Sequence, residues 1–250
     1  LFKRGLKFIN IPTTLLAQVD SSIGGKTGIN TIYGKNLVGS FYQPNLVLAD
    51  TIFLKTLPKR EIICGYAEIL KHSLISDKKF FLYLNKNVQN IFKLKSPFIE
   101  KAIFKSCKIK RDIVQKDEKE NNSRKILNFG HTFAHAYEAS MTYSKKLNHG
   151  ESVILGIYSS LKFSLENKLI NLPEFNLILE HFNKADLSYN VNKYFSKIDT
   201  KKIVSFMQND KKNNSEKINL VLLRKIGSVD LKKRFNHKKI HFFINEKLIN

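Results

Sequence analysis

Apolar residues recur every three or four positions along most of the chain after Pro58, a spacing that gathers them on one face of a helix. The residues between them are mainly charged or amide side chains, as on the exposed face of a packed helix. We therefore predict a series of packed helices, over residues 60–75, 98–115, 128–140 and 150–168.

The pattern before Pro58 is different, because short apolar stretches alternate with residues typical of turns. We predict a strand over Lys7–Pro12, a helix beginning within Thr13–Val19 with threonine caps, and a buried strand over Leu46–Asp50. The glycine-rich stretch Ser21–Gly28 is expected to be a flexible loop.

Two short strands around Gly227 are expected to form a hairpin within residues 217–235. The sequence has no internal repeat, heptad seam or long linker. The predicted fold class is thus α/β followed by a mainly α-helical part, divided at residues 1–56 and 57–250.

Composition narrows the class of protein. A chain of 250 residues that is 42% hydrophobic can bury a core, which excludes wholesale disorder. Its best apolar run, Val153–Leu161, is far shorter than the roughly 20 residues that cross a bilayer, and the start lacks the features of a secretory signal. Cys64 and Cys107 cannot build a disulfide framework, so we expect a soluble, cytoplasmic protein.

The formal net charge of +22 is the strongest compositional feature and favours a polyanionic partner at first sight. The excess is mostly lysine, however, and is scattered along the chain. Arginine is the better side chain for reading phosphates and base edges. Because recognition motifs are also missing, the charge is interpreted as a solvated surface, and neither a nucleic-acid nor a membrane partner is predicted.

Three histidines suggest metal chemistry. His131 and His135 are four residues apart, so their rings share one helix face, and His149 follows after a turn-like segment. Glu68 can add a carboxylate, and three such ligands with one open position are typical of catalytic zinc. The spacing alone also permits ordinary polar histidines, or a pairing of Glu68 with His72.

Two further groups of residues could bind an anion. Gly24 and Gly25 allow a close backbone approach to a ligand, beside Lys26, Lys35 and Asn36, although the segment matches neither common phosphate-loop motif.

The second group is Lys110, Arg124 and Asn128, which could receive a carboxylate. Lysines are so frequent in this chain that chance placement remains the default interpretation of any single one.

Taken together, the motifs resemble one family. The segments IPTTLLAQVDSSIGGKTGIN, GKNLVGSFYQP, LKTLPKREIICGYAEILKH, ILNFGHTFAHAYEA, LNHGES and NDKKN occur in the order and with the separations of the 3-dehydroquinate synthases, the second enzymes of the shikimate pathway. The resemblance runs from Arg4 to about Gly227. It implies the fold of that family: part of a Rossmann-like NAD-binding α/β domain, followed by a helical metal and substrate domain.

The resemblance also implies cofactors. Zn²⁺ or Co²⁺ would be held by Glu68, His131 and His149, which leaves His72 without a metal role. NAD contacts would fall on Thr13, Thr14, Lys26, Lys35, Phe53, Leu54, Lys55 and Thr56.

The implied substrate is 3-deoxy-D-arabino-heptulosonate 7-phosphate. Its hydroxyls would meet Asp20 and Lys71, and its carboxylate would meet Lys110, Arg124 and Asn128. The implied phosphate contacts are Lys26, Asn36, His135 and one of Lys211 or Lys212.

Three residues acquire further roles from the resemblance. His135 would also transfer protons, and Glu120 matches an acidic residue with a catalytic role. Arg4 matches an arginine that reaches the phosphate site of the neighbouring subunit, so a homodimer is implied.

The implied reaction oxidises the substrate transiently with NAD⁺, eliminates phosphate, returns the hydride and closes a ring by aldol addition. The sequence departs from the family at its start, because roughly the first hundred residues of the NAD-binding domain, a large part of a typical domain, have no counterpart. An inactive fragment, half of a split enzyme and a related sugar-phosphate cyclase therefore remain alternatives.

Overall fold

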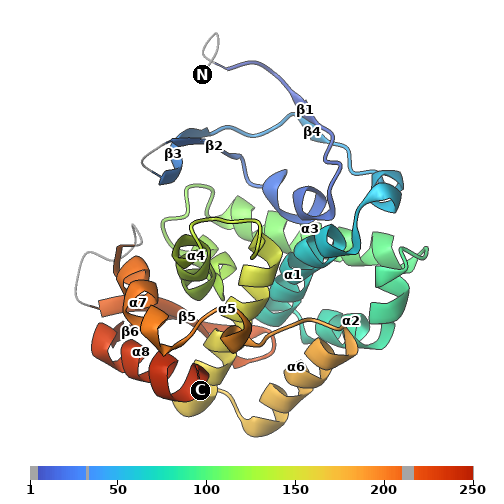
Figure 1. Cartoon of the computed structure of the whole chain (residues 1–250). Coiled ribbons are helices and arrows are strands. Elements are labelled where there is room, and N and C mark those ends of the chain that lie inside the picture. The colour runs from blue at the N-terminus through green and yellow to red at the C-terminus, as the bar shows by residue number, and fades with distance from the viewer. Residues whose placement is uncertain (1–4, 32–33, 210–216, 250) are drawn as a thin grey trace. The chain divides into compact units, whose positions relative to one another are not determined.

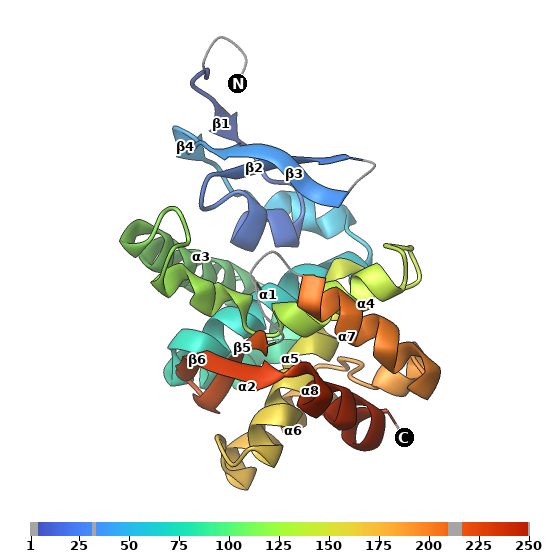
Figure 2. The same cartoon turned by 90° about the vertical axis from the view of Figure 1, so that its left-hand side faces the viewer.

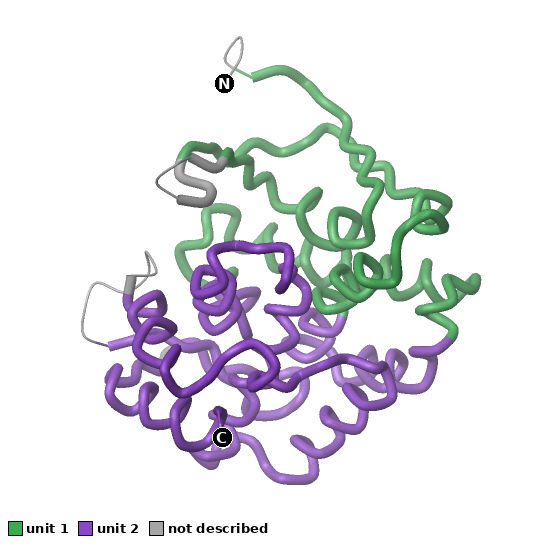
Figure 3. Tube along the Cα trace, viewed as in Figure 1, with its two compact units in different colours: residues 1–69, 90–124 green, residues 70–89, 125–250 purple. Residues whose placement is uncertain are grey.

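The computed structural model describes residues 5–31, 34–209 and 217–249, without the side chains of residues 30, 31, 34–37, 209 and 232. Arg4, Lys211 and Lys212 lie outside the described residues, as do the side chains of Lys35 and Asn36. The chain divides into two compact units, residues 1–69 with 90–124 and residues 70–89 with 125–250 (Figure 3). This division falls inside helix α1 (Lys59–Ser76), whereas the boundary at residues 56 and 57 stays a prediction.

The first unit combines short strands with helices (Figure 1). Strands β1 and β4 pair in parallel, and β2 and β3 form an antiparallel hairpin. Its elements are β1 (Ile9–Asn10), a π-helical turn (Ala17–Ser21), β2 (Lys26–Thr31), β3 (Gly34–Phe41), β4 (Leu46–Val47), a 3₁₀ turn (Thr51–Thr56), the start of α1 (Lys59–Ser76), the end of α2 (Lys78–Phe92) and α3 (Phe98–Lys116).

Two expectations for this unit are wrong. The stretch expected to be a flexible loop becomes strand β2 from Lys26 onward, because its backbone pairs with β3 as far as Phe41. The expected buried strand at residues 46–50 pairs only over Leu46–Val47, and Leu46 and Leu48 are about half exposed. Within the described residues β1 is the only strand that pairs with β4.

A close backbone approach joins α1 to the segment after Thr14. A Cβ at Gly65 would lie 2.5 Å from both Leu15 Cγ and Leu16 N, so only glycine fits. Thr14 Oγ1 accepts a hydrogen bond from Ala17 N at 3.1 Å, which confirms the predicted threonine cap. The segment that carries Asp20 is thereby held against α1.

The second unit is mainly helical. Across the two units, all four predicted helices and the C-terminal hairpin are present. The predictions missed several further elements, among them α2, α6, α7, α8 and the β2–β3 hairpin. The unit's other elements are a 3₁₀ turn that begins in the first unit (Ser123–Asn128), α4 (His131–Ser140), α5 (His149–Glu166), α6 (Leu172–Lys184), two 3₁₀ turns (Val191–Lys193, Lys197–Asp199), α7 (Thr200–Asn209), β5 (Lys217–Lys225), β6 (Ser228–Asn236), α8 (His237–Phe243) and a π-helical turn (Ile244–Leu248).

One hydrophobic core holds this unit together. Helix α4 packs on α5 and α7, and α5 packs on β5 (Figures 1 and 2). Helix α8 packs on α7 and β6. Side chains along the first part of β5 alternate between buried and more exposed, and Ile218, Leu220 and Leu222 are the buried ones that join this core. Phe163 and Phe243 stack edge to face at 4.8 Å between ring centroids.

No helix in the described ranges combines the length and the apolar character needed to cross a bilayer.

The backbones of α4 and α5 meet at two glycines. Gly130, with φ of 80°, begins α4, and a Cβ there would lie 2.9 Å from Ile157 N. A Cβ at Gly156 would lie 2.2 Å from Gly130 O and 2.9 Å from Ala134 N. The two helices can therefore approach only as long as both positions lack a side chain.

We expect Gly156→Ala to lower the free energy of unfolding by about 1–3 kcal/mol, because the added methyl group must displace the α4 backbone. This cost exceeds the roughly 1 kcal/mol by which alanine favours a helix over glycine. Urea unfolding followed by circular dichroism measures the change. Glu166→Ala, at the exposed end of the same helix, is the control and should stay within about 0.5 kcal/mol of the parent. A Gly156→Ala protein as stable as this control would contradict the close approach.

Candidate metal centre

His131 is the first residue of α4, immediately after the left-handed Gly130. Its Nδ1 lies 3.2 Å from Phe129 O, and because a carbonyl oxygen can only accept, Nδ1 carries the proton and donates. With the proton on Nδ1, the lone pair is on Nε2, which is the atom that would bind a metal. A backbone hydrogen bond to the other ring nitrogen is the usual way a protein orients a ligating histidine.

His149 occupies the same position on the next helix, the first residue of α5. Asn148 caps this helix through a reciprocal pair of hydrogen bonds with Glu151, which fixes where α5 begins. His149 Nδ1 lies 3.1 Å from Glu138 Oε1, on α4, and donates to that carboxylate. Its Nε2 is thus also left as an acceptor, and the rings of His131 and His149 lie 5.8 Å apart between centroids.

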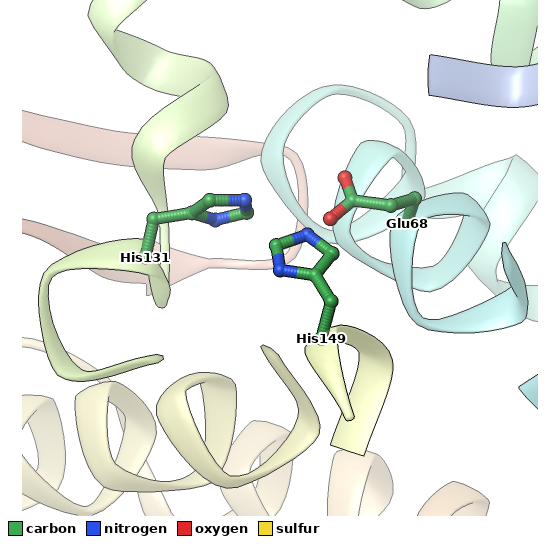
Figure 4. A group of neighbouring side chains, drawn as sticks. All are labelled: Glu68, His131 and His149. Atoms are coloured by element: carbon green, nitrogen blue, oxygen red, sulfur yellow. The ribbon is translucent and has the colours of Figure 1, made fainter. Parts of the chain in front are cut away.

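Glu68, on α1, completes a group of three candidate ligands. One ligand atom from each of Glu68, His131 and His149 lies within 4.8 Å of the others, and the three side chains point toward one another (Figure 4). Two imidazole nitrogens and one carboxylate oxygen are a typical donor set for Zn²⁺ with an open position. The structure therefore brings together the three residues singled out from the sequence.

A second group shares Glu68 and contains Asp20 and His72, again within 4.8 Å. Asp20 Oδ1, however, lies 2.6 Å from the ammonium group of Lys110, so this carboxylate already has a cation beside it. A second cation there would be repelled. The arrangement consequently favours the group with two histidines.

His135 lies one turn after His131 on the same face of α4, with ring centroids 5.4 Å apart. It belongs to neither of the two groups of candidate ligands, and its side chain is exposed. An exposed imidazole beside a metal group is suited to proton transfer.

Lys110 and Asp20 form a partly buried ion pair in the first unit. Lys110 Nζ also donates to the Asp20 backbone oxygen at 2.6 Å, so one ammonium group fixes both the side chain and the backbone of Asp20. Lys110 is only 6% exposed, so solvent screens this pair less than it screens a surface ion pair.

Arg124 is buried in the same unit and binds two loops. Its Nη2 donates to Gly24 O at 2.9 Å and its Nη1 donates to Glu118 O. Burial lowers the pKa of Arg124 below its ordinary value, with Glu120 and Asp117 acting in the opposite direction. A Cβ at Gly24 would lie 2.5 Å from Nη2, so the glycine is required for the guanidinium to reach the loop.

Lys26 forms an ion pair with Glu120, and Gln43 Nε2 donates to Glu118 Oε1 at 2.9 Å. These contacts join the β2–β3 hairpin to the segment between α3 and Arg124. The structure thus pairs Lys26 with Glu120, and Lys110 with Asp20, although the sequence singled them out separately.

Lys71 is buried on α1, and Asn128 ends the 3₁₀ turn before α4.

The residues expected to contact NAD lie on the first unit. Thr13 is exposed, and Thr14 caps the helical turn that follows it. Phe53, Leu54, Lys55 and Thr56 belong to the 3₁₀ turn capped by Asp50, whose carboxylate accepts from Ile52 N at 2.8 Å. Leu54 is fully buried there and serves the core instead of the surface.

Neither cysteine forms a disulfide in the described structure. Cys107 Sγ donates to Gln18 O at 3.3 Å, and burial raises the pKa of this thiol to about 11. The thiol therefore stays protonated near neutral pH and has little reactivity.

Sequence reasoning missed two residues that shape these sites. Glu138 lies seven residues after His131, which is two helical turns along the same face, so its spacing could have identified it. Asp117 accepts from the backbone nitrogens of Asn121, Asn122 and Arg124 at 2.9, 2.7 and 2.9 Å. Only the folded loop brings these three donors to one carboxylate.

Comparison with protein families gives two matches that together cover residues 1–213. A model described as 3-dehydroquinate synthase N-terminal matches residues 1–64, and one described as 3-dehydroquinate synthase C-terminal matches residues 65–213. The 3-dehydroquinate synthase of Pelagibacter ubique (strain HTCC1062) is 63% identical over 247 residues, which are 99% of this chain and 67% of the relative. That of Bartonella quintana (strain Toulouse) is 42% identical over 250 residues, 99% of this chain and 66% of the relative.

Solved structures agree on the fold. A 2-deoxy-scyllo-inosose synthase complexed with carbaglucose-6-phosphate, NAD⁺ and Co²⁺ has a TM-score of 0.87 at 25% identity, over 98% of this chain and 68% of that one. ValA, a 2-epi-5-epi-valiolone synthase from Streptomyces hygroscopicus subsp. jinggangensis 5008 with NAD⁺ and Zn²⁺ bound, has a TM-score of 0.85 at 24% identity, over 96% and 66%. The chain spans about two thirds of the length of these proteins.

We expect the Asp117 carboxyl group to titrate below the ordinary aspartate pKa of about 3.9, chiefly because the backbone N–H of Arg124 bonds the charged form, aided by those of Asn122 and Asn121. A lowered pKa in the folded state means that the contribution to stability is present above the ordinary pKa. It is lost as the pH falls through the lowered pKa. Amide proton shifts of the three donors, followed by NMR against pH, measure the midpoint.

The control for this titration is Asp112→Asn, which removes a carboxylate on α3 that is 44% exposed and accepts hydrogen bonds from the neighbouring Arg111. It should leave the three amide shifts unchanged, whereas Asp117→Asn should abolish their titration. A midpoint at or above 3.9 would refute the role given to Asp117.

Proposed function

The chain belongs to the 3-dehydroquinate synthase family, and we propose that it is the metal- and substrate-binding part of an enzyme that converts 3-deoxy-D-arabino-heptulosonate 7-phosphate to 3-dehydroquinate and phosphate. The structural observation that carries the proposal is the donor set of Glu68, His131 and His149 on α1, α4 and α5. The reaction is a phosphorus–oxygen lyase reaction of the shikimate pathway.

The donor set fits Zn²⁺ or Co²⁺. Both histidines use Nδ1 for a protein acceptor, so each can offer Nε2, and Glu68 can offer a carboxylate oxygen. A bound Zn²⁺ or Co²⁺ would polarise substrate hydroxyls and ease removal of a proton. The protein's own contribution is to fix the direction of the two histidine donors before the metal arrives.

The residues present fit only part of an NAD site. Thr13, Thr14, Lys26, Lys35 and the Phe53–Thr56 turn are proposed to contact the dinucleotide. The sequence contains no glycine-rich pyrophosphate loop of the usual dinucleotide-binding pattern. NAD, when bound, would accept a hydride from the substrate and later return it.

Cationic and polar side chains are proposed to orient the substrate. Lys110, Arg124 and Asn128 would hold its carboxylate, while Asp20 and Lys71 would meet its hydroxyls. The proposed phosphate contacts are Arg4, Lys26, Asn36, His135 and one of Lys211 or Lys212. Charge-assisted hydrogen bonds to a doubly anionic substrate restrict its position, and correct positioning supplies much of the rate enhancement.

Two of these residues are also proposed to act in proton transfer. His135 would exchange a proton through its exposed ring, beside the metal ligand His131. Glu120, paired with Lys26, would supply a carboxylate near the phosphate end.

A related sugar-phosphate cyclase is the second candidate, because the similar solved structures include such enzymes. Identity of 63% and 42% to dehydroquinate synthases, against 24–25% to these cyclases, favours the first reaction.

We also propose a homodimer, in which Arg4 reaches the phosphate site of the partner subunit, and a cytoplasmic location. A division of roles between residues 1–56 for NAD and 57–250 for metal and substrate belongs to the same proposal.

We expect the purified chain to bind close to one Zn²⁺ or Co²⁺, and the double variant His131→Ala, His149→Ala to lose it, because two of three donors are removed. Metal content by inductively coupled plasma mass spectrometry after dialysis measures this. His237→Ala, His241→Ala removes two histidines from α8 and is the matched control, which should keep its metal. Full metal retention by the first variant would eliminate the proposed centre.

Activity is tested on the chain alone and on a chimera in which the segment preceding the matched region of the Pelagibacter ubique relative is joined to Leu1. We expect dehydroquinate formation by the chimera with NAD⁺ and Zn²⁺, and Lys110→Met to lower kcat/KM by about 10- to 100-fold through loss of a charged hydrogen bond. Lys108→Met removes an exposed lysine from the same helix as a control. A folded, metal-loaded chimera without turnover would refute the proposed reaction.

A further inference from the structure

The carboxylate of Glu138 is buried on the inner face of α4, with its side chain 7% exposed. Burial of an ionised carboxylate is costly unless hydrogen bonds compensate it. Its Oε1 lies 3.1 Å from His149 Nδ1, on the first residue of α5. The protein thus keeps a buried acid beside one candidate metal ligand.

The two candidate histidines are anchored differently. His131 donates its Nδ1 proton to a neutral backbone carbonyl, Phe129 O, whereas His149 donates to a negatively charged side chain. A carboxylate acceptor increases the electron density on the ring and makes Nε2 a stronger donor. His149 should therefore be the more strongly binding of the two imidazoles.

The surroundings explain why a negative charge is needed at this point. His131 and His149 each occupy the first residue of a helix, and helix N-termini carry positive partial charge. A divalent cation bound by these two histidines would meet an unfavourable field. Glu68 is one compensating carboxylate, and Glu138 supplies a second without occupying a coordination position.

We propose that Glu138 is a positioning residue for the metal centre: its carboxylate holds His149 in the tautomer with the proton on Nδ1 and strengthens Nε2 as a metal donor. This inference rests on the proposed metal role of His149. It also concerns a property of the metal-free protein, because the hydrogen bond exists before any metal binds.

Two other roles of Glu138 give different results in experiments. If Glu138 were a metal ligand itself, its removal would lower the coordination number. If it served packing alone, its removal would lower stability but would leave the tautomer and the metal affinity of His149 unchanged. The variants Glu138→Gln and Glu138→Leu separate these roles. Glutamine keeps the volume and an acceptor oxygen but loses the charge, whereas leucine loses both the acceptor oxygen and the charge.

The first experiment uses the metal-free chain with ¹⁵N-labelled histidine. In the parent, we expect the NMR shifts of the His149 ring to report protonated Nδ1 and unprotonated Nε2. Glu138→Gln should preserve this pattern, and Glu138→Leu should lose it. An unchanged tautomer in Glu138→Leu would overturn the positioning role, and this result does not depend on metal binding.

The second experiment measures Zn²⁺ affinity by competition with a chromophoric chelator, on the same chains. We expect the dissociation constant to rise about 10-fold in Glu138→Gln and up to about 100-fold in Glu138→Leu, the range found when such outer partners are removed. Glu166→Gln removes a carboxylate from the exposed end of α5 and should match the parent. Co²⁺ absorption should keep its tetrahedral intensity in Glu138→Gln, since no ligand is lost.

Glu138→Gln keeps the test decisive if Glu138→Leu does not fold, since the glutamine variant preserves the shape of the side chain. Parental affinity in Glu138→Gln would then overturn the inference. If the parent chain itself binds no Zn²⁺, the proposed metal centre fails, and the tautomer experiment still reports on the hydrogen bond alone.

Discussion

The contact between the backbones of α4 and α5 at Gly130 and Gly156 is the constraint on which the candidate metal centre depends. With no Cβ at either position, Gly130 O can lie where a side chain on α5 would otherwise project. The left-handed conformation of Gly130 starts α4 at His131, and the capping box at Asn148 starts α5 at His149. Two glycines and one cap thereby place His131 and His149 at the first positions of two helices whose backbones pack closely together.

Hydrogen bonds to backbone and carboxylate then determine what those rings can do. In each case an acceptor that cannot donate occupies Nδ1, so the chemistry of the donor set follows from protein contacts alone. The first unit uses the same principle for its cations: Lys110 and Arg124 bind backbone carbonyls of the Asp20 and Gly24 segments. Charged groups that are proposed to meet substrate are consequently already fixed by the fold, which reduces the entropy lost when a ligand binds.

The large positive charge has two different components. A few cations are buried or paired with specific acceptors, as Lys110 is with Asp20 and Lys26 is with Glu120. Many other lysines are exposed, among them Lys101, Lys108 and Lys116 on α3. Net charge therefore describes the surface of this protein, while its specific chemistry depends on a small number of placed groups.

The sequence by itself determined four helices, α1, α3, α4 and α5, together with the C-terminal hairpin and the three candidate ligands. Helical periodicity is a local property, and the family motifs, with Glu68, His131 and His149 among them, are read directly along the chain. Tertiary structure alone decided that Leu46–Asp50 is largely exposed, that Lys26 starts a strand, and that Glu138 bonds His149 and Asp117 gathers three amides. Each of these features depends on which segments, distant in the sequence, lie beside one another in the fold. The spacing of residue types along the chain does not reveal such contacts.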